Sequence, residues 1–267
     1  MIRTVLSVAA VVAGLPGTGL EAAELPERLQ VRGTLKVLVT RVTGRNEFFS
    51  LEPEGPKGFD RELLEGFCRV HDLQLEPVPV DGWDELVPAL LAGRGDLIAG
   101  RFTVTEARRG KIDFTAQVFP TRAVAVTRRP HPPMETVEGL HRVRVGTVAG
   151  SSLEEAIRRA GLPAANVDSS IQPGQLPAAV REGRVDAVVL GIEDAIVARR
   201  SDPELELGAF LGPPGSLAWG VRKDDGELLA LLNAHIENTR RSIGWNRLVV
   251  SYFGEDSVEI LRKAGTR

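Results

Sequence analysis

The sequence predicts an α/β protein of two lobes, each a sheet flanked by helices. Strand-like and helix-like stretches alternate between residues 35 and 99 and again between residues 122 and 199, and extended segments near 118–121 and 217–221 join the two series. Such alternation is typical of sheets covered by helices. Because ligands of open α/β sheets bind outside the carboxyl ends of the strands, two facing lobes predict a cleft between them.

The first series contains three predicted strands and two predicted helices. Residues 35–42 alternate and are rich in β-branched side chains, which is typical of a strand. Apolar residues recur at helical spacing in residues 59–71. The other elements are a strand at 75–80, a helix at 83–92 that ends at Gly93, and a short buried strand at 96–99.

The second series begins with strands at 122–127 and 142–148. Ser151 or Ser152 caps a helix at 152–160, whose first turn holds two glutamates. Further along, the pattern indicates these elements: helices at 176–182 and 192–199, a strand at 187–190, a Gly- and Pro-rich break at 212–215, a strand at 217–222, and closing helices at 227–240 and 245–253.

Composition excludes several classes of protein. The 267 residues are 43% hydrophobic and 26% charged, as in an ordered globular chain, and the formal net charge of -3 gives no sign of a face for nucleic acid. The single cysteine, Cys68, excludes an internal disulfide and a Cys-based zinc site. The four histidines show no metal-ligand spacing, and no phosphate-binding Gly-rich loop is present. We therefore expect no metal and no cofactor.

The first residues predict export from the cytoplasm. Arg3 is followed by an uncharged, mostly apolar run at 4–15, which is short of the roughly 20 residues that span a bilayer. Small residues follow, so residues 1–23 have the features of a signal peptide, with cleavage after Ala22 or Ala23. An N-terminal membrane anchor is the alternative. We expect a periplasmic protein with no stable membrane insertion after cleavage.

Four segments carry a resemblance to a known family. They are GFDRELLEGF (58–67), WDELVPALLAGRGDLIAG (83–100), TVTEARRGKIDFT (103–115) and VGTVAGSSLEEAI (145–157). In this order and spacing they closely resemble the family 3 extracellular solute-binding proteins of polar amino-acid ABC transporters. The resemblance implies the type II periplasmic binding protein fold, with lobe 1 at 34–117 plus 222–267, lobe 2 at 123–216, and hinges near 118–122 and 217–221.

Two shorter segments suggest a narrower analogy. GRGDLIAGRFTVT and LAWGVRKDD resemble the binding module of membrane-bound lytic murein transglycosylases. In those proteins the module precedes a domain that cleaves peptidoglycan. Since the chain ends at Arg267, we expect a stand-alone relative without the catalytic domain.

The resemblance implies a set of ligand-binding residues. Arg108 matches the family's Thr-x-x-Arg motif, in which the guanidinium holds the ligand's carboxylate through two charge-assisted hydrogen bonds. The alternative is a solvated arginine, like its neighbour Arg109. The other candidates are Thr103 and Thr105 beside the carboxylate, Ser151 and Ser152 at a helix N-terminus, and the pocket aromatics Trp83, Phe48 and Phe49, any of which could instead cap a helix or fill the core.

The sequence departs from the family at the position that would bind a ligand amino group. Many relatives carry an acidic residue five positions after the Asp of Asp-Ala-Val-Val, where this chain has Gly191. Glu193 and Asp194 lie close by and could substitute, or could serve the helix that starts there. Arg101 adds a cation near the cleft mouth or lies on the surface.

The function that follows is binding rather than catalysis. We expect a monomeric periplasmic protein that captures a small carboxylate-bearing solute, such as an amino acid or short peptide, for uptake through an ABC transporter permease. The alternatives are a ligand-sensing or accessory module of a cell-wall or redox enzyme system, and an enzyme resembling cyclohexadienyl dehydratase. For the enzyme, Glu193 is the one candidate acid or base.

Overall fold

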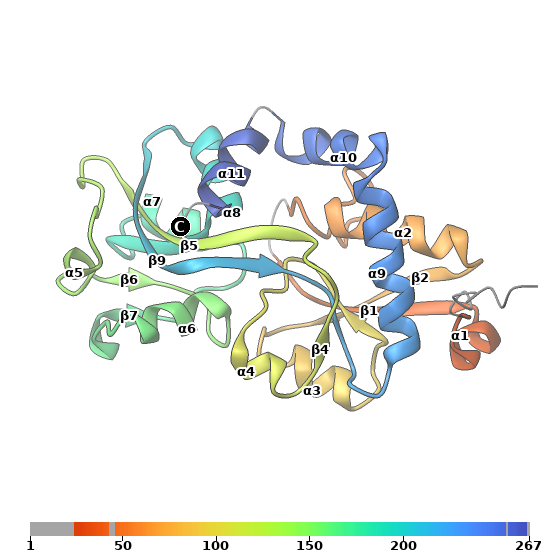
Figure 1. Cartoon of the computed structure of the whole chain (residues 1–267). Coiled ribbons are helices and arrows are strands. Elements are labelled where there is room, and N and C mark those ends of the chain that lie inside the picture. The colour runs from red at the N-terminus through yellow and green to blue at the C-terminus, as the bar shows by residue number, and fades with distance from the viewer. Residues whose placement is uncertain (1–23, 43–45, 255, 266–267) are drawn as a thin grey trace, which may run out of the picture.

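Two five-stranded sheets form the two halves of the molecule (Figure 1). The computed structural model describes residues 24–42, 46–254 and 256–265. The proposed signal peptide at 1–23 lies outside the described residues, so it stays a prediction. Within the described ranges, no helix is long and apolar enough to cross a membrane.

The first sheet is parallel at one edge and antiparallel at the other. β1 pairs in parallel with β2 and β3, whereas β10 runs antiparallel between β3 and β4. In spatial order the strands are β2 (Gln74–Val80), β1 (Thr34–Thr40), β3 (Leu97–Ile98), β10 (Gly220–Val221) and β4 (Asp113–Phe114). The helices of this part of the chain are α1 (Glu27–Arg32), α2 (Phe59–Val70), α3 (Leu86–Leu91) and α4 (Glu106–Arg109).

The second sheet holds the remaining strands. In spatial order they are β7 (Val167–Asp168), β6 (Val145–Gly146), β8 (Ala187–Gly191), β5 (Phe119–Arg128) and β9 (Leu205–Leu217). Its helices are α5 (Val137–Leu140), α6 (Ser152–Arg159), α7 (Leu176–Arg181) and α8 (Ile192–Ser201), with a 3-10 turn at Ala164–Asn166. The prediction of an α/β fold with two sheets flanked by helices is confirmed.

Helix α2 shows how the sequence pattern sets the packing. The apolar residues at helical spacing are buried except Val70 at the end of the helix, and Phe59, Leu64 and Phe67 are fully enclosed. Gly58 precedes the helix with a φ of 103°. A Cβ at this position would lie 2.5 Å from the backbone of Phe48, so only glycine allows the loop and the helix to approach this closely.

β5 and β9 form one antiparallel ribbon that connects the two sheets. They pair from Phe119↔Leu217 to Arg128↔Leu205. The predicted break at residues 212–215 is wrong, because these residues belong to β9. β9 is an edge strand, where proline's missing N–H costs no ladder hydrogen bond, and register shifts absorb the irregular residues.

Three helices close the chain: α9 (Gly226–Arg240), α10 (Ile243–Phe253) and α11 (Asp256–Gly265). α9 and α10 contact α2, whereas α11 contacts α8 and β5 (Figure 1). The last helix thus packs on the second sheet, although the prediction assigns 222–267 to the first lobe. From here, lobe 1 means the first sheet with α1–α4, α9 and α10, and lobe 2 means the second sheet with α5–α8 and α11.

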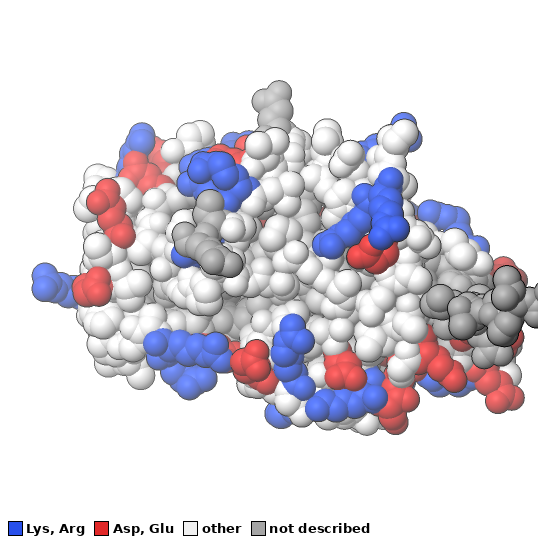
Figure 2. Space-filling model, viewed as in Figure 1, with Lys and Arg blue, Asp and Glu red and all other residues white. Residues whose placement is uncertain are grey.

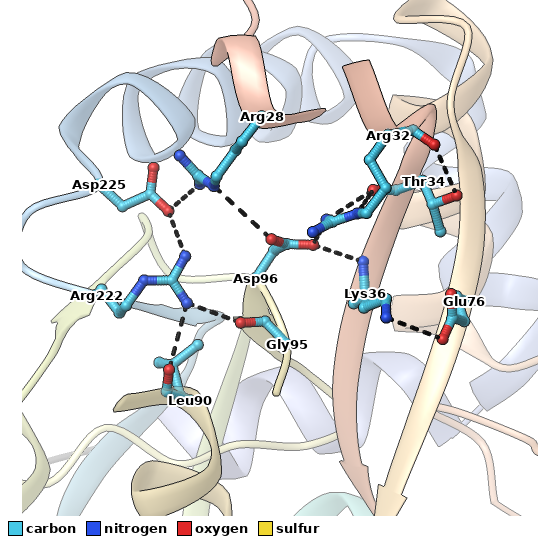
Figure 3. Close-up of polar contacts among 10 residues, drawn as sticks. All are labelled: Arg28, Arg32, Thr34, Lys36, Glu76, Leu90, Gly95, Asp96, Arg222 and Asp225. Carbon is cyan, nitrogen blue, oxygen red and sulfur yellow. Dashed lines mark hydrogen bonds and ion pairs between the residues drawn. The ribbon is translucent and has the colours of Figure 1, made fainter. Parts of the chain in front are cut away.

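A cluster of charged side chains attaches α1 to lobe 1 (Figure 3). Arg28 pairs with both Asp96 and Asp225, and Arg32 pairs with Asp96. Arg222 reaches Asp225 from the end of β10, at 3.2 Å. Both aspartates are buried, so the arginines of α1 and β10 supply the charge that compensates their burial.

Candidate functional site

A cavity of about 460 Å³ lies between the lobes and extends into lobe 2. This volume lies within the range of small-molecule sites. Its polar end, at the interface of the lobes, is lined by Glu47, Trp83, Arg101, Thr103, Thr121, Ser151, Ser152, Gly191, Glu193 and Asp194.

The other end of the cavity lies in lobe 2, between α7 and α8. Leu176, Pro177 and Ala178 line it from α7, and Val197 and Ala198 line it from α8. Gln175, Arg181, Ser201 and Asp202 also line this part, so the cavity offers charged groups at both ends, with aliphatic side chains between α7 and α8.

Arg101 is held inside the polar end by its backbone and by its charge. It has a φ of 68°, and its N–H donates to Asp60 Oδ2 at 3.1 Å, as does the N–H of Gly100 at 2.9 Å. Its guanidinium pairs with Asp194 across the lobes and lies 5.9 Å from the centre of the Trp83 ring. The side chain therefore lines the cavity between the lobes, and the alternative of a place on the outer surface is wrong.

Electrostatic contacts keep Arg101 charged despite its burial. Burial disfavours the charged form, but the carboxyl groups of Asp194, Glu193 and Glu47 outweigh it and raise the pKa of Arg101. Burial also raises the pKa of Asp60 to about 6, against the two backbone N–H groups that lower it. Arg101 therefore acts as a fixed cation in the wall of the cavity.

Glu193 is a buried carboxyl group at the same end. Only 2% of the residue is exposed, and the hydroxyl of Thr121 lies 2.9 and 2.7 Å from its two oxygens. Burial and the nearby charge of Asp194 raise the pKa of Glu193 to about 8. At neutral pH its carboxyl group is therefore mainly protonated and can donate a hydrogen bond.

Two close approaches join the lobes on the other side of the cavity. Ser152 Oγ donates to Thr103 Oγ1 at 2.9 Å. A Cβ on Gly150 would lie 2.7 Å from Asp84 Cβ, so the lobes meet there with no room for a side chain. Ser151 caps α6 by accepting the N–H of Glu154 at 3.2 Å.

Arg108 lies behind Thr103 and is not one of the residues that line the cavity. Its Nη1 donates to the carbonyl oxygen of Thr103 at 2.8 Å, and its guanidinium carbon lies 4.2 Å from the centre of the Phe102 ring. No carboxylate of the described residues lies within ion-pair distance of it. Burial consequently lowers its pKa to about 10, and the distant charge of Glu155 compensates only in part.

Six of the ten predicted site residues reach the cavity. They are Trp83, Thr103, Ser151, Ser152, Glu193 and Asp194. The other four lie elsewhere. Thr105 caps α4. Phe48 is fully buried and packs edge-on against Phe59 and Phe119, and Phe49 is 2% exposed. The two rings belong to the core.

Sequence reasoning missed Glu47 and Thr121 as parts of the cavity, and it left Arg101 open between the cleft mouth and the surface. For Arg101 the available signal is Gly100 before it, because a turn at positive φ re-aims the next side chain. Among the described residues, no group of three or more His, Cys, Asp or Glu side chains is arranged to hold a metal ion. On the face in Figure 2, basic and acidic side chains are interspersed, without a broad field of one sign.

Comparison with known proteins identifies the family. The model for bacterial extracellular solute-binding proteins, family 3, matches residues 41–255. The chain belongs to this family. The resemblance stated from the four sequence segments is thereby confirmed, and so is the solute-binding role that defines the family 3 proteins.

Several curated relatives are similar over most of the chain. The lysine/arginine/ornithine-binding periplasmic protein of Escherichia coli is 25% identical over 95% of this chain and 97% of its own. The L-arginine-binding protein of Pseudomonas aeruginosa is 27% identical over 78% of this chain and 84% of its own. Membrane-bound lytic murein transglycosylase F of Desulfosudis oleivorans is 26% identical over 84% of this chain. The match covers 50% of the transglycosylase.

Solved structures agree on the fold. An ancestral arginine-binding protein bound to arginine gives a TM-score of 0.73 at 26% identity, covering 84% of this chain and 99% of its own. A mutant of ArgBP from T. maritima gives a TM-score of 0.77 at 24% identity, covering 85% and 98%. The family 3 architecture of two lobes thus extends over the described chain.

Proposed function

We propose that this family 3 protein captures a small carboxylate-bearing solute between its lobes and delivers it to an ABC transporter. One observation carries the proposal: the guanidinium of Arg108 is partly buried with no carboxylate partner among the described residues. A buried cation without a counterion is costly, and an anionic ligand removes that cost. Because the guanidinium bonds to the Thr103 carbonyl behind the cavity in this structure, it would turn past Thr103 to give a ligand carboxylate two parallel N–H groups.

Closure of the lobes explains how such a ligand is retained. Arg108 is bonded to the carbonyl of Thr103, and the Thr103 hydroxyl meets Ser152 of lobe 2. A carboxylate that enters between these hydroxyls receives hydrogen bonds from both lobes. Because these bonds form only when the lobes are closed, the ligand favours the closed state.

The names of relatives support uptake of a small solute. Relatives include a lysine/arginine/ornithine-binding periplasmic protein and an L-arginine-binding protein. Like the sequence prediction of a signal peptide, these names favour a periplasmic location and a permease as the docking partner. Neither name fixes the ligand of this chain.

The experiment is a thermal-shift and calorimetry screen over carboxylates, with amino acids, dipeptides, muropeptides and simple organic acids as probes. A probe at 100 times its Kd adds about 2.7 kcal/mol of apparent stability. Arg108→Ala should abolish the shift for the best probe, whereas Arg109→Ala, an exposed arginine next to it, should retain it. Arg108→Ala that is folded and binds the probe as the wild type does would overturn the carboxylate anchor.

A second candidate function rests on Glu193. A carboxyl group that is protonated at neutral pH and lines a cavity can serve as a general acid. The corresponding reaction is a dehydration of a cyclic carboxylate. Turnover of prephenate that is lost in Glu193→Gln would support catalysis, whereas binding of prephenate without turnover would support capture alone.

A sensing or accessory role is the remaining alternative. It draws on the similarity to transglycosylase F, which is about twice the length of the matched region. A complex with a cell-wall or redox enzyme, isolated without any permease, would favour this role over transport.

A further inference from the structure

We propose that Arg101 determines the specificity of the cavity, by occupying the acidic acceptor that a ligand ammonium group would need. The inference rests on the proposed function, since it names the class of carboxylate that the site takes. That class is carboxylic acids without an α-ammonium group.

The guanidinium of Arg101 lies in the cavity between the lobes. Arg101 comes from lobe 1 and Asp194 from lobe 2, and their ion pair crosses the cavity. Both side chains are about one-fifth exposed, at 19% and 21%. The pair is therefore largely shielded from water. In such a shielded place, charges interact more strongly than on an exposed surface.

Contacts of its backbone and its guanidinium hold Arg101 in place. Asp60 Oδ2 accepts the N–H groups of Gly100 and Arg101, and this holds the turn at positive φ from which the side chain enters the cavity. The ring of Trp83 lies beside the guanidinium. These contacts make Arg101 part of the preformed wall.

Each acid at this end of the cavity already contacts another group. Asp194 is paired with Arg101, and both oxygens of Glu193 contact the hydroxyl of Thr121. Glu47 also faces Arg101 and raises its pKa. An ammonium group entering this end would compete with the fixed guanidinium of Arg101 for Asp194 and Glu47, and would find no acid placed for it alone.

The guanidinium of Arg101 can donate further hydrogen bonds to a ligand. Among the described residues, the hydrogen bond of its guanidinium goes to Asp194 through Nη1, and the residue lines the cavity. Arginine has five N–H donors. An uncharged or anionic oxygen of the ligand can accept them, which an ammonium group cannot.

The test compares amino acids with their desamino counterparts. The probes are L-glutamate with glutarate, L-leucine with 4-methylpentanoate, and L-phenylalanine with 3-phenylpropanoate, measured by calorimetry at pH 7. The wild type should bind the desamino acid at least about tenfold more tightly in the pair that it accepts, as expected when a ligand charge is left without a partner.

Variants then assign the effect to Arg101. Arg101→Gly suits the positive φ and uncovers Asp194, so it should reverse the preference in favour of the amino acid. Arg101→Lys keeps the cation and should keep the preference. Arg94→Gly removes an exposed arginine away from the cavity and should change nothing. In the double variant Arg101→Gly/Asp194→Asn, the gain for the amino acid should disappear.

The outcomes separate this inference from the proposed function. A wild type that prefers the amino acid, or an Arg101→Gly variant with an unchanged preference, overturns the role of Arg101 while capture of carboxylates stands. A gain that survives in the double variant overturns Asp194 as the acceptor. A wild type that binds no carboxylate of the wider screen overturns both proposals.

Discussion

The carboxyl group of Glu193 occupies the space that a side chain at residue 191 would fill. A Cβ placed on Gly191 would lie 2.2 Å from Glu193 Oε1. A carboxyl group from two positions further along the chain thus lies beside the position where the sequence motif lacks its acidic residue. The acid arrives on the first turn of α8 and is bonded to Thr121 in the ribbon between the lobes.

Enlarging Gly191 should displace this carboxyl group. Gly191→Ala is expected to destabilise the fold by about 1–3 kcal/mol, as overpacking of a filled site does, and to weaken ligand binding. Urea unfolding measures the first effect and calorimetry the second. Gly226→Ala is the control, because Gly226 starts α9 with open space around it. Equal free energies of unfolding for the two variants would contradict the close packing of Glu193 against residue 191.

Glu193 should make stability depend on pH. Its pKa is about 8 in the fold against 4.5 ordinarily, so the folded chain retains a proton that the unfolded chain loses between these values. The stabilisation is complete below the ordinary pKa and is lost as pH rises toward 8, by up to about 1.4 kcal/mol per pH unit. Urea unfolding between pH 6.5 and 8.5, above the pKa of about 6 of Asp60, should therefore show a decline that Glu193→Gln removes.

The control for this pH profile is Glu237→Gln, whose carboxylate is half exposed. This variant should follow the wild-type curve. Parallel curves for the wild type and Glu193→Gln would mean that Glu193 titrates alike in the folded and unfolded chain.

The close approach of Gly150 and Asp84 should govern closure of the lobes. Gly150 has a φ of 68°, and Gly161 has a similar φ of 76° with open space around it. Alanine at either position incurs the same backbone strain of about 1–2 kcal/mol, but only at 150 does it collide across the lobes. Small-angle X-ray scattering should give a larger radius of gyration for Gly150→Ala than for Gly161→Ala. Identical radii would show that this contact does not limit closure.

Asp96 should be a strong determinant of the stability of lobe 1. It accepts the N–H of Lys36 at 2.7 Å and pairs with two arginines of α1. Asp96→Asn is expected to cost roughly 2 kcal/mol, since charge-assisted hydrogen bonds to a buried group are lost. Asp81→Asn, whose side chain is 83% exposed and pairs with Arg41, should cost less than about 0.5 kcal/mol. Chemical denaturation of both variants tests the difference, which would vanish if the cluster were only a surface feature.

Local pattern predicted most of the elements but not how they pair. The spacing at 59–71 and the run at 187–190 correspond closely to α2 and β8. The strand predicted at 142–148 shrinks to two residues, because only Val145 and Gly146 find partners on both sides. The insertion of β10 between β3 and β4 depends on residues more than 100 positions apart, which no local pattern encodes.

Residue type and place in the chain predicted part of the candidate site. Thr103, Ser152 and Trp83 follow strand ends or start a helix, so they reach the cavity. Arg101 was not predictable, because its direction depends on a positive φ that Asp60 stabilises from another element. Arg108 points to Thr103 rather than into the cavity, a difference of side-chain direction that spacing does not specify.

The place of β10 in the first sheet has a consequence for biosynthesis. β3 and β4 are made early, but the strand that separates them, Gly220–Val221, follows only after all five strands of the second sheet. Until then a nascent chain carries an open sheet edge, which is a template for aggregation. Folding of this sheet is therefore delayed until the second half of the polypeptide has emerged, and a chain truncated before residue 220 should depend on chaperones to stay unaggregated.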